Sequence, residues 1–234
     1  MGLKDQYEDY WHRRNKQPVK RASSANSPGE LREIVEHIVD KQSAIVLDAG
    51  SGPGDLQQIA WADHTVVYGC DISETACREA AKRGMVAVCA DLNSGHLPYQ
   101  NESIETITCI EVIEHVPDPQ HLLKELFRIL KNNGQLVLTT PNIRYVRHIG
   151  KLVFEGVFPH TTTDDFIWGG GHLHYFTVKD LIGLIKQAGF EHITLHVNRN
   201  QFHRSLKRKI AYRLLGHRLF AEWFCNGIIA EVRK

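Results

Sequence analysis

The stretch Ile45-Val-Leu-Asp-Ala-Gly-Ser-Gly-Pro-Gly54 decides the fold class of this chain. The residues before Asp48 are apolar, which is typical of a buried strand. Three glycines follow at alternate positions, where the missing Cβ permits a positive φ and the close approach of a ligand. The residues from Asp55 predict the start of a helix. A strand, a glycine turn and a helix in this order form the nucleotide-binding corner of a doubly wound α/β sheet.

The spacing of the glycines indicates which nucleotide this corner binds. A dinucleotide turn reads G-x-G-x-x-G, and its helix N-terminus carries a pyrophosphate. Counted from Gly50, the third glycine position is Asp55, so an acid stands where the pyrophosphate would lie. Asp48 can accept hydrogen bonds from an ammonium group. The turn therefore favours an adenosyl ligand that carries a cationic amino acid, and a nicotinamide-dependent oxidoreductase is the weaker alternative.

The residues from Leu47 to Gly54 resemble motif I of the class I S-adenosylmethionine (SAM) methyltransferases. The resemblance implies that the cofactor is SAM. It also implies a Rossmann-like α/β fold, with a seven-stranded, mostly parallel sheet, helices on both faces and an antiparallel last strand. We expect residues 1–234 to form a single domain.

Acids also close the next two predicted strands. Asp71 follows the strand 66–70 and can accept hydrogen bonds from both ribose hydroxyls, and Asp91 follows the strand 85–89 and could bind the adenine amino group. The alternative interpretation is that each acid only caps the helix after it. The predicted cofactor-binding residues are Asp48, Gly50, Ser51, Gly52, Asp71, Ile72, Asp91, Leu92 and Ile110.

The remaining elements follow from periodicity and capping residues. Ser27-Pro-Gly-Glu30 predicts a helix start, and Thr177 predicts another. Further expected elements are strands over 103–110, 135–140, 192–197 and 226–232, and helices over 118–130 and 181–188. Residues 1–26 are expected to form an arm or a lid over the cofactor. Residues 143–176 lack clear periodicity and are expected to form a substrate-facing insert.

The fourth strand runs into Glu111-Val-Ile-Glu114-His115. On one helical turn, residues at i, i+3 and i+4 share a side, so two carboxylates and an imidazole would converge. Such a set suits Mg²⁺, Mn²⁺ or Fe²⁺, and His172 or His174 could add a ligand. The alternative is that Glu114 and His115 only tie down the loop. Since methyl transfer requires alignment and deprotonation of the nucleophile, we predict His115 and His172 as catalytic residues.

Three segments resemble the ubiquinone-biosynthesis O-methyltransferases and the small-RNA 3′-terminal 2′-O-methyltransferases: 109–116, 140–142 and 172–177. In the RNA family the corresponding residues bind a divalent metal, which implies Glu111, Glu114, His115 and His172 as ligands here. Both families methylate one oxygen of a vicinal diol, whose hydroxyl a chelating metal would acidify.

The resemblance implies O-methylation of a small catechol-like, sugar or lipid-linked acceptor. One alternative is an RNA 3′ end, although the chain lacks an additional RNA-binding domain. Another is a SAM-binding subunit without its own chemistry.

Composition limits the compartment and the partners. The chain is 42% hydrophobic and 24% charged, and its net charge of +1 makes a nucleic-acid partner improbable. The five cysteines lack metal-type spacing, and Cys70, Cys89 and Cys109 fall in strand-like runs as reduced core residues. No apolar run approaches the ~18 residues of a membrane helix. We therefore expect a cytoplasmic protein that acts on a small molecule.

The segment 199–218 is basic and amphipathic, because Phe202, Leu206, Ile210 and Leu214 recur every four residues among lysines and arginines. Its apolar side could pack on the sheet, with the cations solvated. It could also lie on an anionic membrane as a peripheral contact. A third possibility is that it holds the phosphates of a nucleotide sugar or RNA.

Overall fold

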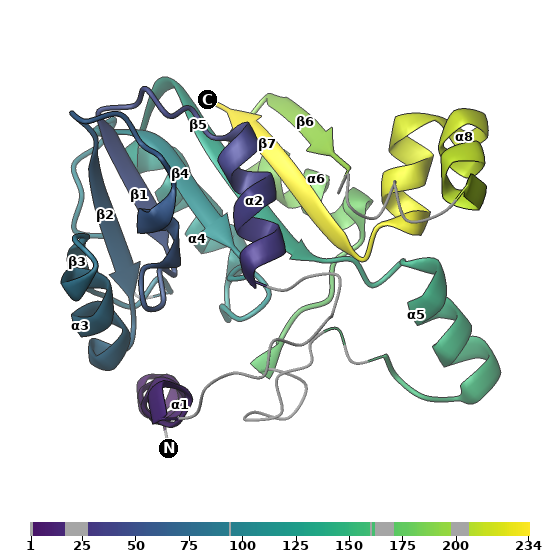
Figure 1. Cartoon of the computed structure of the whole chain (residues 1–234), viewed down its shortest axis with the longest axis horizontal. Coiled ribbons are helices and arrows are strands. Elements are labelled where there is room, and N and C mark those ends of the chain that lie inside the picture. The colour runs from purple at the N-terminus through teal and green to yellow at the C-terminus, as the bar shows by residue number, and fades with distance from the viewer. Residues whose placement is uncertain (1, 17–27, 94, 160, 162–170, 198–205) are drawn as a thin grey trace.

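The computed structural model describes residues 2–16, 28–93, 95–159, 161, 171–197 and 206–234 (Figure 1). Seven strands form one sheet in the order β3-β2-β1-β4-β5-β7-β6. β7 runs antiparallel to β5 and β6, and the other pairs are parallel. The strands are β1 (Ile45–Ala49), β2 (Val66–Asp71), β3 (Val86–Cys89), β4 (Ile104–Ile110), β5 (Leu130–Pro141), β6 (His192–His196) and β7 (Gly227–Arg233). The predicted fold class is confirmed.

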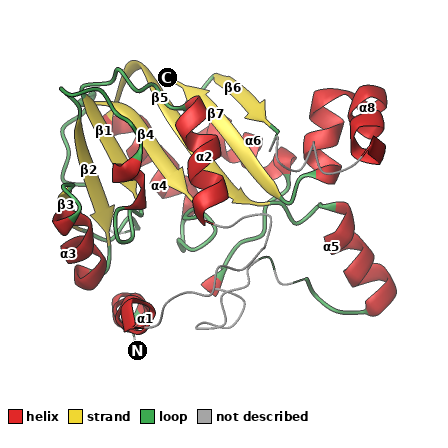
Figure 2. Ribbon diagram, viewed as in Figure 1, coloured by secondary structure: helices red, strands yellow, loops and turns green. Residues whose placement is uncertain are grey.

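Helices cover both faces of this sheet (Figure 2). α2 lies over one face, and α4 and α6 lie together over the other. The helices are α1 (Leu3–Lys16), α2 (Pro28–Ile38), η1 (Asp55–Gln58), α3 (Glu74–Lys82), α4 (Pro119–Ile129), α5 (Val146–Gly150), the π-helical turn η2 (Lys151–Glu155), α6 (Val178–Gln187) and α8 (Leu206–Phe224). None of the helices in these described residues is long and apolar enough to cross a bilayer.

Side chains cap three of the helices, and the cap at Thr177 was predicted. Ser73, Asp118 and Thr177 each accept a backbone N–H three residues along the chain, at the starts of α3, α4 and α6. The predicted cap at Ser27 lies outside the described residues.

The central strands carry apolar residues on both faces because helices cover both faces. Leu47, Ile107 and Leu136 are fully buried, as is Leu126 of α4. Parallel strands end at the same edge of a sheet, so β1, β2 and β4 bring Asp48, Asp71 and the segment 111–115 to one side. The core thus fixes the edge on which the candidate site is built.

Some local predictions are wrong. The helix predicted from Asp55 is only the short 3₁₀ helix η1. The indole N–H of Trp61 donates to the carbonyl of Leu56, and the chain becomes extended at Ile59. Cys89 is exposed, unlike the buried Cys70 and Cys109.

The insert after β5 is partly helical, although its sequence shows no helical periodicity. α5 and η2 extend away from the sheet (Figure 1), and every residue from 151 to 158 is exposed. A helix that packs no face against the core needs no amphipathic pattern, which explains why its sequence did not reveal it.

The basic segment is also helical, but its apolar side does not pack on the sheet. Within α8, Ile210 and Leu214 are exposed, and burial resumes only at Phe220. Gly216 breaks the helix with φ 74° and ψ 172°. Residues 199–205 of the predicted segment lie outside the described residues.

Candidate active site

The glycine turn after β1 presses against the segment that follows β4. Gly50 has φ +78°, and a Cβ there would lie 2.3 Å from Cγ2 of Val112. The amides of Gly50 and Ser51 both donate to the carbonyl of Cys70, at 2.7 and 3.0 Å. Only glycine fits at position 50, and the turn brings the predicted cofactor site next to the Glu111–His115 segment.

Asp48 is buried at the end of β1. Its Oδ1 accepts a hydrogen bond from the Thr108 hydroxyl at 2.9 Å. Burial raises the pKa of Asp48 to about 7 despite that hydrogen bond. A cationic ligand would favour the ionised form and restore an ordinary pKa, so the site is suited to an ammonium group.

Asp71 and Asp91 occupy the ends of β2 and β3. Asp71 accepts hydrogen bonds from the amides of Gly52 and Ser73, both at 2.9 Å, and burial raises its pKa. Asp91 accepts the amide of Asn93 at 2.9 Å. Each acid shapes its own turn, but neither caps a helix: the N-cap of α3 is Ser73, and a turn follows Asp91. The binding interpretation stays a prediction.

The other predicted cofactor residues surround these acids. Ser51 and Leu92 are buried, and Ile72 and Ile110 are half-buried. Among the described residues, the hydroxyl of Ser51 has no hydrogen-bond partner. A buried hydroxyl without a partner is a candidate for a ligand contact. The cofactor roles of these residues remain predictions.

The Glu111–His115 segment forms turns, so the expected helical turn is wrong. Glu111 has φ 54°, a left-handed conformation that is uncommon for a residue other than glycine. Its Oε1 accepts the Thr139 hydroxyl at 3.0 Å, and its amide donates to the Thr139 carbonyl at 3.1 Å. Residues with strained backbone conformations of this kind are frequent at functional sites.

Three of the four predicted metal ligands converge. Oε1 of Glu114 lies 4.0 Å from Nε2 of His115 and 3.9 Å from Nε2 of His172. One ligand atom from each of these residues fits within 4.8 Å of the others, and Glu111 is not part of this group. The amides of Leu173 and His174 donate to the Glu114 carbonyl, which ties the two segments together.

The histidine rings are held by their other nitrogens. Nδ1 of His115 donates to the Gly171 carbonyl at 3.1 Å, and Nδ1 of His172 lies 2.7 Å from the Thr161 hydroxyl. A carbonyl only accepts, so the proton of a neutral His115 sits on Nδ1 and Nε2 carries none. This arrangement orients histidine ligands in metal sites.

Burial dominates the electrostatics of the group. It raises the pKa of Glu111 to about 7, and burial together with the charge of Glu111 raises the pKa of Glu114 well above its usual range. Burial, and then the neighbouring His115, lower the pKa of His172 to about 4. His172 is therefore neutral at physiological pH and can accept a proton or bind a cation.

The two carboxylate oxygens of Glu114 differ in their hydrogen bonding. Its Oε2 accepts the Thr140 hydroxyl at 2.9 Å, whereas its Oε1 has no hydrogen-bond partner among the described residues. Leaving a buried carboxylate oxygen unpaired is costly. A cation between Glu114, His115 and His172 would satisfy it, so these residues fit a divalent metal.

Residues 1–26 were expected to form an arm or a lid, and helix α1 within them contacts both halves of the site. The Tyr7 ring meets the His115 ring edge-on at 6.1 Å between centroids. The Trp11 ring packs against the glycine turn, because a Cβ on Gly52 would lie 2.9 Å from it. Glu8 accepts hydrogen bonds from Ser73 and Thr75 at the start of α3. The aromatic spacing of Tyr7 and Trp11 was the sequence signal for this face.

The Glu8 contact predicts how α1 responds to acid. Burial raises the pKa of Glu8, but hydrogen bonds from Thr75 and Ser73 outweigh it and lower the pKa to about 2 from 4.5. A lowered pKa stabilises docking above pH ~4.5, and the contribution is lost as pH falls toward 2. Amide exchange of residues 3–16, corrected for the intrinsic rate at each pH, should accelerate over this range. At pH 7, Glu8→Gln should accelerate it about tenfold, a loss typical of charged hydrogen bonds.

The matched control is Asp9→Asn, because Asp9 pairs only with Arg13 within α1 among the described contacts. Equal exchange in Glu8→Gln and in the unchanged protein would show that Glu8 does not hold the helix.

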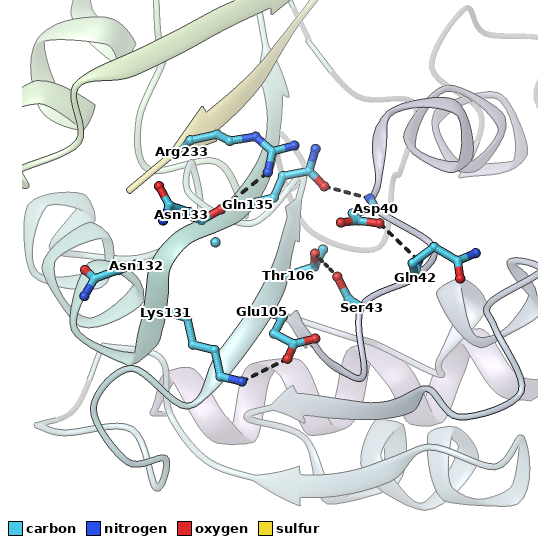
Figure 3. Close-up of a pocket in the computed structure, with 11 residues that line it drawn as sticks. Asp40, Gln42, Ser43, Glu105, Thr106, Lys131, Asn132, Asn133, Gln135 and Arg233 are labelled. Carbon is cyan, nitrogen blue, oxygen red and sulfur yellow. Dashed lines mark hydrogen bonds and ion pairs between the residues drawn. The ribbon is translucent and has the colours of Figure 1, made fainter.

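A hollow lies at the edge of the sheet opposite the candidate site, near the starts of β1, β4 and β5 (Figure 3). It measures about 220 Å³. Its polar groups satisfy one another: Lys131 pairs with Glu105 at 2.9 Å, and the hydroxyls of Ser43 and Thr106 lie 2.7 Å apart. None of the predicted site residues lines it, so we place the active site at the other edge.

Comparisons with known proteins agree with this site. Residues 10–195 match the family model described as "Methyltransferase domain". A ubiquinone biosynthesis O-methyltransferase of Coxiella burnetii is 30% identical over 159 residues, and the match covers 64% of each chain. A protein of the same name from Pseudomonas fluorescens is 27% identical over 169 residues, covering 64% of this chain and 72% of that one.

Solved structures share the fold at low identity. A SAM-dependent methyltransferase of Thermotoga maritima, described as a possible histamine N-methyltransferase, has a TM-score of 0.66 and 16% identity over 99% of this chain and 100% of that one. The [4+2]-cyclase SpnF has a TM-score of 0.61 and 19% identity, and the match covers 93% of this chain and 85% of that one. Fold and motif I thus define a class I SAM-dependent methyltransferase. The chain belongs to the methyltransferase-domain family, which excludes the nicotinamide alternative.

Proposed function

We propose that this protein transfers the methyl group of SAM to a hydroxyl oxygen of a small molecule, with a divalent cation held by Glu114, His115 and His172. The observation that carries the proposal is the buried Oε1 of Glu114, which has no hydrogen-bond partner among the described residues and lies 4.0 and 3.9 Å from Nε2 of His115 and His172. Support for an oxygen acceptor comes from the relatives named ubiquinone biosynthesis O-methyltransferase. The site chemistry is consistent with that acceptor.

In this proposal the protein aligns the reactants and manages one proton. Asp48 would accept the ammonium group of SAM, and Asp71 the ribose hydroxyls. Nε2 of His172, neutral at physiological pH, would bind the cation beside the acceptor's hydroxyl, whose proton would leave to water. The cation would lower the pKa of that hydroxyl and fix its orientation. Helix α1, with Tyr7 and Trp11 against the site, would act as the lid that excludes water.

The test is S-adenosylhomocysteine formation with a panel of catechols, sugars and RNA 3′ ends. We expect turnover with a vicinal-diol small molecule, its loss in a chelator and its recovery on addition of Mg²⁺ or Mn²⁺. Turnover that survives exhaustive chelation would overturn the metal assignment. Turnover with RNA alone would favour the RNA-end alternative. Binding of SAM without turnover by the whole panel would favour the non-catalytic alternative.

A further inference from the structure

Large apolar side chains are exposed mainly on two projecting segments. Of the 14 large hydrophobic residues exposed in the described part of the chain, ten lie within 146–158 or 210–219. The most exposed are Phe154 at 87% and Leu214 at 80%. Exposed apolar side chains that are concentrated on two segments of a folded protein indicate an interaction site.

The two segments start from one buried junction. The side-chain amide of Asn142, just before α5, donates to the carbonyls of Glu222 and Cys225 at the end of α8. The Arg144 guanidinium pairs with Glu222 at 3.0 Å and lies over the Trp223 ring at 4.3 Å. Both helices leave the same end of the sheet (Figure 2). A single partner surface can therefore contact both.

The same segments are strongly basic. Residues 206–221 carry five lysines and arginines and no acid, and residues 143–158 carry three against one. The side chains of Lys209, Arg213 and Arg218 are exposed on α8, as are those of Arg147 and Lys151 on α5 and η2. The complementary partner is an extended anionic surface.

We propose that the 146–158 and 209–219 segments form a docking surface for a membrane that contains anionic phospholipids. Leu152, Val153 and Phe154 are consecutive and exposed in η2, so their side chains point in different directions from its axis. A fluid lipid interface can accept such side chains, whereas a protein groove buries one fixed face. The cations would lie at the phosphate level, where they are attracted to the negative surface potential. This inference does not depend on the acceptor proposed above.

Vesicle co-sedimentation tests the proposal. We expect the protein to sediment with vesicles of phosphatidylcholine and phosphatidylglycerol, weakly with phosphatidylcholine alone, and less in high salt. The double variant Phe154→Ser, Leu214→Ser and the variant Arg213→Glu should each lower binding at least about tenfold, because binding scales with apolar area and charge. SAM affinity should stay unchanged in both, which shows that they fold.

The matched control is Val86→Ser on the edge strand β3, where the side chain is 47% exposed but lies outside the two segments. Equal sedimentation of the double variant and this control would overturn the proposal. So would dimerisation that the double variant abolishes, measured by light scattering, since a second copy would then cover the surface. Binding of single-stranded RNA that needs Arg213 but not Phe154 and Leu214 would also overturn it.

Discussion

Replacement of His115 by alanine should lower turnover about 10²- to 10⁴-fold, the range for loss of assistance to proton removal in the transition state. The variant removes Nε2, which lies 4.0 Å from Glu114 Oε1 and would be one of the atoms that hold the cation. SAM affinity should remain near that of the unchanged protein, because Asp48 and Asp71 lie on other strands. Turnover is measured as S-adenosylhomocysteine formation and affinity by calorimetry. His172→Ala should behave alike.

His174 provides the matched control for this experiment. It lies two residues from His172 and is half-buried, but its Nε2 contacts the Pro117 carbonyl at 3.3 Å and it is not part of the group around Glu114. His174→Ala should change turnover less than about twofold, as a substitution away from the site. If His115→Ala kept full turnover, the catalytic assignment would be wrong. If it lost SAM binding and melted at a lower temperature, His115 would be a structural residue instead.

The site residues on strand ends could be predicted because the sheet topology follows from the sequence. Asp48 and Asp71 end buried apolar runs, and parallel strands bring their carboxyl ends to one edge. His172 was predicted through the family resemblance. Its approach to Glu114, 3.9 Å from Nε2 to Oε1, joins positions more than fifty residues apart with α4 and β5 between them, which no local pattern describes.

The departures from prediction have local physical causes. Glu111 leaves the group because its left-handed backbone and the Thr139 hydroxyl direct it elsewhere. Helical spacing cannot predict that, since a single positive φ breaks the periodicity. The contact between Tyr7 and His115 joins segments more than a hundred residues apart and is made by a mostly polar helix. The i, i+4 spacing of Tyr7 and Trp11 was a signal for this face that the sequence-based prediction did not use.

The fold alone does not determine the reaction. Structures with the same architecture include a possible histamine N-methyltransferase and a [4+2]-cyclase. What differs within one fold is the set of side chains around the transferred group. In this chain that set is Glu114, His115 and His172, with Tyr7 above them, so experiments on the acceptor must begin there.

Asp48→Asn should weaken SAM binding roughly 10- to 150-fold, which corresponds to the loss of a charged hydrogen bond of about 1.5–3 kcal/mol. The variant keeps the shape of the side chain and its neighbour Thr108 while removing the charge that would face the ammonium group. The same carboxylate predicts a pH dependence. Because burial raises its pKa to about 7, the free protein increasingly holds it protonated below that pH.

An ammonium ligand requires the ionised form, so SAM affinity should fall about tenfold per pH unit below pH ~7 and level off above it. Asp48→Asn should abolish that slope. The raised pKa also means that Asp48 destabilises the free fold above pH ~4, so the variant should melt at the same or a higher temperature. Asp55→Asn is the control, since Asp55 pairs with Arg83 at the surface. An unchanged slope in Asp48→Asn would place the ammonium group elsewhere in the site.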